Sequence, residues 1–291
     1  MAPALALLGA LAACSASPEA QLSTASTRPP GPSTTVTLAP ATTTTSPPPA
    51  VNATIEDLME AAGMTTLGRR IFVAARPELQ DAAGLATDCG LDVTAEPGGT
   101  HTFGCLVRGR IHVRSFGAPE LHDLSYAVAA HELLHAVYIQ LPAAERTRLD
   151  ADLATARAGN ARLEERLSVY AETADDTPNE VHSVLGSEFP DLSPALEAHY
   201  ARYFDRSKVL SAYQRTLGGR EDELFRLAGE AEELNARLEE MQAELDALEA
   251  SGRISAYNAL IPRYNSLIRE HNAAARLYNE RLSDYRRLIA A

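Results

Sequence analysis

Hydrophobic residues recur at helical spacing over the last quarter of the chain. In residues 224–248 the apolar positions alternate at intervals of three and four, and after Ser251-Gly252 the alternation resumes through residues 254–289. Such a seam is typical of a coiled coil. Two seams joined by a short glycine turn predict an antiparallel helical hairpin over residues 218–291.

The charges of the two predicted helices favour their pairing. Residues 221–250 contain eleven acidic residues and two arginines, whereas residues 251–291 contain seven arginines and three acidic residues. Helices of opposite charge are expected to face each other, although pairing between two copies of the chain is an open alternative. Pro262 is expected to kink the second helix, and His271 on the seam is interpreted as a polar residue that fixes the register.

The pattern before residue 218 predicts an α+β domain that is mostly helical. One helix is expected from an Asn52 cap to Gly63, a second over residues 67–75, and another after Pro77. The apolar period then changes to two, which predicts an antiparallel β-hairpin from residues 102–107 and 110–115. Further helices are expected over residues 143–158 and 160–175 and from Ser193-Pro194 onward.

The candidate chemistry lies in residues 121–141, a helical pattern without proline or glycine. His131, Glu132 and His135 form an HExxH motif there. The spacing of four puts both imidazoles on one helix face, where they can bind one Zn²⁺, and leaves Glu132 beside them to activate water. The alternative is an amphipathic helix whose histidines are solvated or satisfied within the core.

The residues around this motif resemble those of zincin metallopeptidases. Val128 stands three positions before the first histidine and Val137 two positions after the second, as that family prefers. Residues 137–141 contain no glycine or histidine, which excludes the HExxHxxGxxH continuation of the metzincins. The resemblance implies a zincin-like peptidase domain over residues 51–217, with Zn²⁺ as cofactor and a peptide or protein as substrate.

A third zinc ligand is expected downstream. Asn179, Glu180 and Ser183 resemble the NExxS signature of the gluzincins, in which the glutamate binds zinc, so Glu180 has that role by position. His182 and Glu188 are the alternatives on residue chemistry and proximity.

Two features of this segment bear on that assignment. Thr177 and Glu180 also form a capping box, with Pro178 at the first helical position, which would place Glu180 for purely local reasons. Val184 stands where the thermolysin-like group has an aspartate that supports a ligand histidine. Any support for the histidines must therefore come from elsewhere.

The resemblance implies further roles. Glu132 would be the general base that takes a proton from the attacking water. Candidates for stabilising the oxyanion are His182, Tyr170, Tyr200 and Tyr203, each of which can equally be a packing residue. By analogy, residues 110–115 would bind an extended peptide by strand addition, the alternative being a hairpin that only covers the core.

The N-terminal region and the cysteines predict export. The apolar run before Cys14 resembles a bacterial lipoprotein signal, although it lacks Lys or Arg at its start. This implies removal of residues 1–13 and lipidation of Cys14, with an ordinary secretory signal as the alternative. Residues 14–50 are rich in Ser, Thr and Pro and predict a disordered tether. In an exported protein Cys89 and Cys105 predict a disulfide.

The net charge of −13 argues against nucleic acid or an anionic membrane surface as a direct partner. The sequence thus predicts an exported zinc peptidase, held by a lipid at the outer face of the bacterial cytoplasmic membrane. The competing prediction is a non-catalytic envelope lipoprotein that binds a partner through its coiled-coil hairpin. A third is an intact zinc site that the hairpin blocks until a partner binds.

Overall fold

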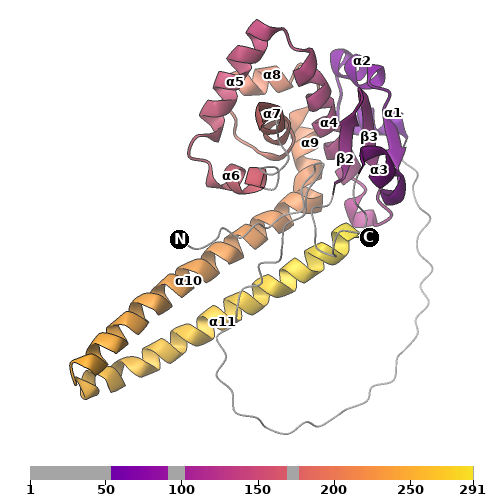
Figure 1. The fold of residues 1–291 in the computed structure, drawn as a ribbon. Helices are drawn as coiled ribbons and strands as arrows, with labels where there is room; N and C mark the ends of the chain where they lie inside the picture. The colour runs from indigo at the N-terminus through magenta and orange to yellow at the C-terminus, as the bar shows by residue number, and fades with distance from the viewer. Residues whose placement is uncertain (1–53, 91–101, 169–176, 291) are drawn as a thin grey trace, which may run out of the picture.

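A computed structural model describes residues 54–90, 102–168 and 177–290 of the chain (Figure 1). The expected signal segment, Cys14, the tether of residues 14–50 and Tyr170 lie outside these ranges. The described residues are mostly helical with one small sheet, as the α+β prediction requires. None of the helices in these ranges has both the length and the apolarity of a membrane span.

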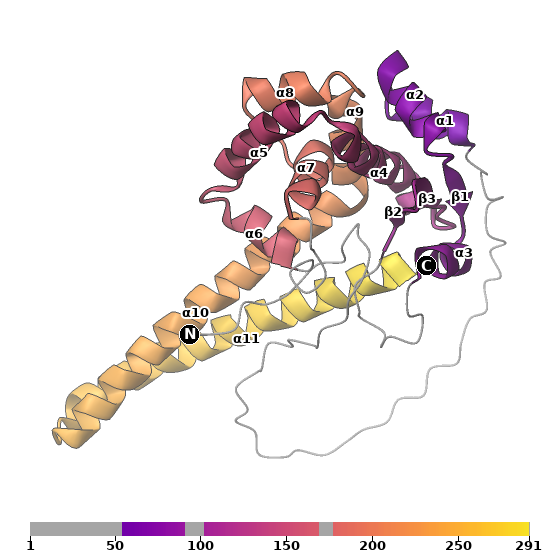
Figure 2. The ribbon, with the colours of Figure 1, turned by 45° about the horizontal axis from the view of Figure 1, so that its top comes forward.

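The centre of the body is helix α4 (Leu124–Gln140), which carries the HExxH motif. Its side chains are buried on nearly all sides. A helix with that pattern belongs inside a core, because no face of it is suited to water. The sheet covers one side of α4 and helix α7 (Thr177–Glu188) the other (Figure 2).

The sheet has three strands, β1 (Glu78–Gln80), β2 (Gly104–Val107) and β3 (Arg110–Arg114), in the order β1-β3-β2. Strand β3 pairs antiparallel with β2 and parallel with β1. The predicted hairpin is therefore confirmed.

The loop of the hairpin contains Arg108 and Gly109, both with positive φ, as a tight two-residue connection requires. The helix predicted after Pro77 begins later than expected. Residues 78–80 instead form β1, and helix α3 (Ala82–Cys89) follows. A three-residue strand has no periodicity of its own, and its partner lies some thirty residues downstream.

The two faces of the sheet have different neighbours. Ile111 and Val113 are fully buried in the main core beside α4. Between them, His112 lies on the opposite face, toward α3. A disulfide between Cys89 and Cys105 joins α3 to β2 there, as the sequence predicts.

Further helices of the body lie on both sides of α4 (Figure 2). They are α1 (Ile55–Ala61), α2 (Thr66–Ala74), α5 (Ala143–Arg157), α6 (Ala161–Ser168), α8 (Pro194–Tyr200) and α9 (Arg206–Tyr213). Helix α1 is capped by Thr54 in a reciprocal capping box with Asp57, while the predicted cap Asn52 lies outside the described residues. The predicted break after α5 falls at Gly159, which has positive φ.

Helices α10 (Gly219–Ala250) and α11 (Ile254–Ala290) form the predicted antiparallel hairpin, which extends away from the body (Figure 1). The body and the hairpin are not separated at residues 217–218. Helix α9 continues through a π-helical segment, η2 (Gln214–Gly218), directly into α10. The near end of the hairpin also shares the main core of the body, since Leu224 and Tyr285 belong to one apolar cluster with α4.

The far end of the hairpin is a thinner structure with its own small apolar clusters. Helix α11 runs through Pro262 without a break, and ahead of His271 Leu260 and Leu267 are the most buried positions, whereas Ile254 is 55% exposed. The most buried positions here, Leu260 and Leu267, are therefore each one residue before the predicted seam positions Ile261 and Ile268.

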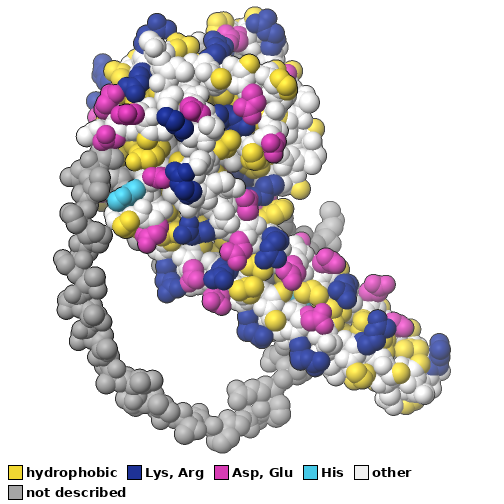
Figure 3. All heavy atoms as spheres, turned by 180° about the vertical axis from the view of Figure 1, so that it is seen from behind, with side chains coloured by type: hydrophobic (Ala, Val, Ile, Leu, Met, Phe, Trp, Pro, Cys, Tyr) yellow, Lys and Arg dark blue, Asp and Glu magenta, His cyan; other side chains and the backbone are white. Residues whose placement is uncertain are grey.

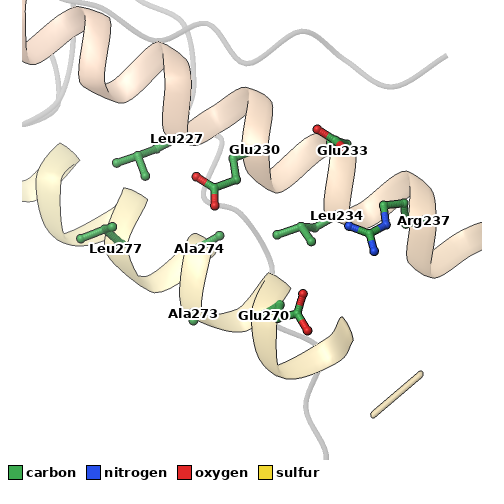
Figure 4. A pocket seen from close by; sticks show the side chains of 9 residues that line it. All are labelled: Leu227, Glu230, Glu233, Leu234, Arg237, Glu270, Ala273, Ala274 and Leu277. Carbon is green, nitrogen blue, oxygen red and sulfur yellow. The ribbon is translucent and has the colours of Figure 1, made fainter. Parts of the chain in front are cut away.

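Midway along the hairpin the two helices leave a shallow groove of about 560 Å³. Leu234 points from α10 toward Ala274 on α11, and Leu227 lies farther along the groove on the side of Leu277 (Figure 4). On the outside of the hairpin acidic and basic side chains are interspersed (Figure 3). This exposed surface is typical of a solvated helix pair.

Candidate metal centre

Helix α4 brings the two motif histidines together inside the body. His131 is fully buried and His135 is 8% exposed, and their Nε2 atoms lie 3.2 Å apart. Two nitrogens bound to one tetrahedral ion at about 2.0–2.1 Å would be roughly 3.3 Å apart. The histidine spacing thus fits a single zinc ion.

The orientation of His131 is fixed from helix α7. Ser187 donates its hydroxyl proton to the Ser183 carbonyl over 2.7 Å, so its oxygen is left to accept, and it lies 3.2 Å from His131 Nδ1. Nδ1 is therefore the protonated nitrogen of this ring. The Nε2 lone pair then faces His135, which is the tautomer that a metal ligand needs.

A buried ion pair stands behind the same ring. Arg166 donates through Nε and Nη2 to the two oxygens of Glu188, over 2.6 and 2.8 Å, and Glu188 Oε1 lies 3.8 Å from His131 Nδ1. Both side chains are almost fully buried. Glu188 therefore supports the histidine and is not free to act as the third ligand. In the thermolysin-like group an aspartate at the position of Val184 supports a ligand histidine. Val184 is packed in the core and has no polar group, and Glu188 supports His131 in its place.

Glu180 approaches the histidines from the first turn of α7. Its Oε1 lies 3.7 Å from His135 Nε2, and its Oε2 is buried without a hydrogen-bond partner among the described residues. The first distance is too long for a hydrogen bond and near that between two ligands of one ion. The candidates for third ligand are Glu180, His182 and Glu188. Of these three, only Glu180 has an oxygen turned toward His135 Nε2.

Glu132 lies beside the histidines and is 1% exposed. Its carboxylate and the two imidazoles offer ligand atoms that all lie within 4.8 Å of one another. Burial, and then the nearby Glu180, raise the pKa of Glu132 well above its usual range. A bound cation would reverse this effect and favour the carboxylate. We call His131, Glu132, His135 and Glu180 the cleft cluster.

Burial also sets the protonation state of the candidate ligand His131. The pKa of His131 is lowered well below its usual range, mainly by burial and further by His135 and Arg166. The imidazole is thus neutral at neutral pH. A neutral imidazole is the form that binds a metal.

The cleft cluster opens to solvent through a cleft of about 300 Å³ between β2 and the first turn of α7. Strand β2 is the edge of the sheet along this cleft, whereas β3 is the central strand and is paired on both sides. The prediction that residues 110–115 bind substrate by strand addition is therefore wrong, because that strand has no free edge. The edge available for an extended peptide belongs to β2.

Gly104 on β2 allows the sheet to approach the general-base candidate. A Cβ built at this position would lie 2.7 Å from Glu132 Oε1 and 2.6 Å from Val128 Cγ1. Any residue other than glycine would displace the carboxylate or the strand. This constraint joins two segments far apart in the sequence, so the motif alone does not reveal it.

The oxyanion candidates lie away from the cleft. His182 is fully buried, with its Nε2 2.9 Å from His199 Nε2 and its ring stacked on Tyr200. Burial and then His199 lower the pKa of His182 well below its usual range. Tyr203 packs against His199 in the same aromatic group. Within the described residues, none of the three predicted side chains lines the cleft.

Comparison with known proteins gives no further identification. No family model matches the chain, and neither a curated protein nor a solved structure is significantly similar to it. The resemblance to zincins rests on the HExxH and NExxS residues. To these the structure adds Gly104 and Arg166, which the sequence analysis did not single out, and the contact of Ser187 with His131.

Proposed function

We propose that the protein is an exported zinc-dependent peptidase whose site is the cleft cluster. The observation that carries the proposal is the 3.2 Å approach of the His131 and His135 Nε2 atoms beside an open cleft, with the Glu132 carboxylate within 4.8 Å of both rings and Glu180 Oε1 3.7 Å from His135 Nε2. His131, His135 and Glu180 would hold the ion. Three protein ligands with a further open position are typical of catalytic zinc.

The residues of the chain would divide the hydrolysis among them. Bound zinc would supply Lewis acidity for water and for the peptide carbonyl. Glu132 would take the proton of the attacking water as the new C–O bond forms. It would then pass that proton to the amine as the C–N bond breaks, so that the carboxylate is regenerated.

Strand β2 would position the substrate. Its outer edge borders the cleft, and an extended peptide could pair with it through main-chain hydrogen bonds. Such main-chain pairing does not depend on the side chains of the bound peptide. It would hold the scissile bond alongside Glu132. The proposed substrate is therefore an unfolded or extended segment of a protein.

The disulfide between Cys89 and Cys105 supports export, because such bonds persist in oxidising compartments. Attachment to a membrane through Cys14 is part of the same proposal. The long α10–α11 hairpin, with its open groove, favours one alternative function. That alternative is a non-catalytic envelope protein that binds a partner through the hairpin.

The test is zinc content together with cleavage, measured on the full chain. We expect one zinc per chain to be lost in His131→Ala and Glu180→Ala, and to be retained in Glu132→Gln. Hydrolysis of unfolded, fluorescently labelled casein should be lost in all three variants. Glu120→Gln, at an exposed acidic residue outside the cleft, is the matched control.

Two results would overturn the proposal. One is a zinc content that does not depend on His131, measured after zinc is supplied without chelator. The other is casein hydrolysis that persists in Glu132→Gln. Either would leave the hairpin-mediated binding protein as the better explanation.

A further inference from the structure

A second group of potential ligands lies on the face of the sheet turned away from α4. Glu78 on β1 stands directly opposite His112 on β3 in the parallel register, and Asp88 comes from α3. We call these three residues the sheet cluster. Their ligand atoms all lie within 4.8 Å of one another.

The centre of the sheet cluster is a buried imidazole. His112 is 4% exposed, and its Nδ1 is buried without a hydrogen-bond partner among the described residues. This nitrogen lies 3.6 Å from Asp88 Oδ2 and 3.9 Å from Glu78 Oε2. A buried nitrogen that lacks a partner is unfavourable, so something must satisfy it.

The distances indicate what that partner is. Both are too long for hydrogen bonds, yet they are close to the separation of about 3.3–3.6 Å expected between ligands of one ion. Arg110 binds the far oxygen of Glu78, Oε1, over 3.0 Å, so Glu78 Oε2 stays available to an ion. Gln80 donates to Asp88 Oδ2, the oxygen that lies 3.6 Å from His112 Nδ1, so this oxygen would accept from Gln80 with one lone pair and bind the ion with the other.

The position of each ligand is set by a different constraint. The pairing of β1 with β3 fixes Glu78 against His112, and the pairing of β2 with β3 fixes Cys105 against the other side of His112. The disulfide from Cys105 ends at Cys89, the neighbour of Asp88. The bond therefore holds α3 where the Asp88 carboxylate can reach the imidazole.

We propose that Glu78, Asp88 and His112 bind a second divalent metal ion, separate from the cleft cluster. One imidazole with two carboxylates is a ligand set for Zn²⁺ rather than for Ca²⁺ or Mg²⁺, which prefer oxygen alone. Water would complete the coordination, because both carboxylates are partly exposed. The ion would fasten α3 and β1 to the sheet and thereby stabilise the strand next to the cleft.

The experiment counts zinc on the full chain. Metal-stripped protein is loaded with ZnCl₂ in a non-coordinating buffer, desalted, and measured by elemental analysis. We expect two zinc ions per chain in the parent and one in the double variant His131→Ala/His135→Ala. Adding His112→Gln to that double variant should remove the last zinc, and excess Ca²⁺ should not displace it.

Further variants distinguish loss of a zinc ligand from misfolding, and distinguish the sheet cluster from the cleft cluster. Asp88→Asn, at a partly exposed carboxylate, should lose the same zinc while helical circular dichroism stays unchanged. His122→Gln, a histidine outside both clusters, should keep it. His112→Gln alone should lose the zinc of the sheet cluster but keep one zinc and the cleavage activity. A failure of this inference can therefore be distinguished from a failure of the proposed function. A double variant that binds no zinc, or zinc unaffected by His112→Gln, would overturn the inference.

Discussion

The cleft cluster and the sheet cluster contain the same kinds of groups but are supported in different ways. In the cleft, Ser187 and the buried Arg166–Glu188 pair fix the orientation of an imidazole. In the sheet cluster, His112 is held by strand register and by a nearby disulfide, and solvent reaches both carboxylates. Preorganised support of the first kind suits chemistry, whereas the second suits the attachment of one element to another.

The largest expected effect separates the clusters by activity. Glu132→Gln removes the proposed general base and should lower casein hydrolysis by about 10²–10⁴-fold, with zinc content unchanged. Asp88→Asn should do the reverse, with one zinc lost and hydrolysis within about twofold of the parent. Parallel assays of zinc and hydrolysis check both, and equal losses of activity in the two variants would remove the distinction between them.

The support behind His131 can be tested by breaking the buried ion pair. Arg166→Met leaves Glu188 charged and buried without its partner, which should lower the free energy of unfolding by about 3–5 kcal/mol and weaken zinc binding at the cleft about 10–100-fold. Urea unfolding and a zinc competition assay measure the two effects.

The matched control for that change is Arg157→Met. Arg157 also pairs with a glutamate, Glu164, but at the surface, where such pairs contribute about 0–1 kcal/mol. A similar loss of stability in both variants would show that burial of the Arg166–Glu188 pair has no special consequence.

The same contrast explains what the sequence could and could not predict. The cleft histidines lie four residues apart on one helix, so local spacing places them together. Glu180 was assigned by its motif, and the hairpin by its seam and charges. The sheet cluster comes from three segments that meet through strand pairing and a disulfide, and a three-residue strand such as β1 leaves no pattern. Gly104 and Arg166 are equally non-local, because each is explained only by the residue it contacts.

The disulfide should matter more to the sheet cluster than to the cleft cluster. Cys89→Ala/Cys105→Ala removes a link across sixteen residues and should cost about 3 kcal/mol in the free energy of unfolding. It should also release the zinc of the sheet cluster, because Asp88 is no longer held near His112. The zinc that depends on His131 should remain. Thermal unfolding and zinc counting test this, and loss of the cleft zinc first would contradict it.

The last prediction concerns strand β2, which borders both clusters, and adds a single methyl group to it. Gly104 faces Glu132, whereas its neighbour Cys105 faces α3, because successive residues of a strand point to opposite faces. In Gly104→Ala the new methyl group would meet the Glu132 carboxylate and Val128. We therefore expect a loss of about 1–3 kcal/mol in stability and about 10²-fold in hydrolysis, with both zinc ions retained. Gly117→Ala, where no atom outside the adjoining residues of the chain lies within 4 Å of the added Cβ, is the control and should change neither. Unimpaired hydrolysis in Gly104→Ala would mean that the position of the Glu132 carboxylate against β2 is not required, and the role of general base would then have to be reassigned.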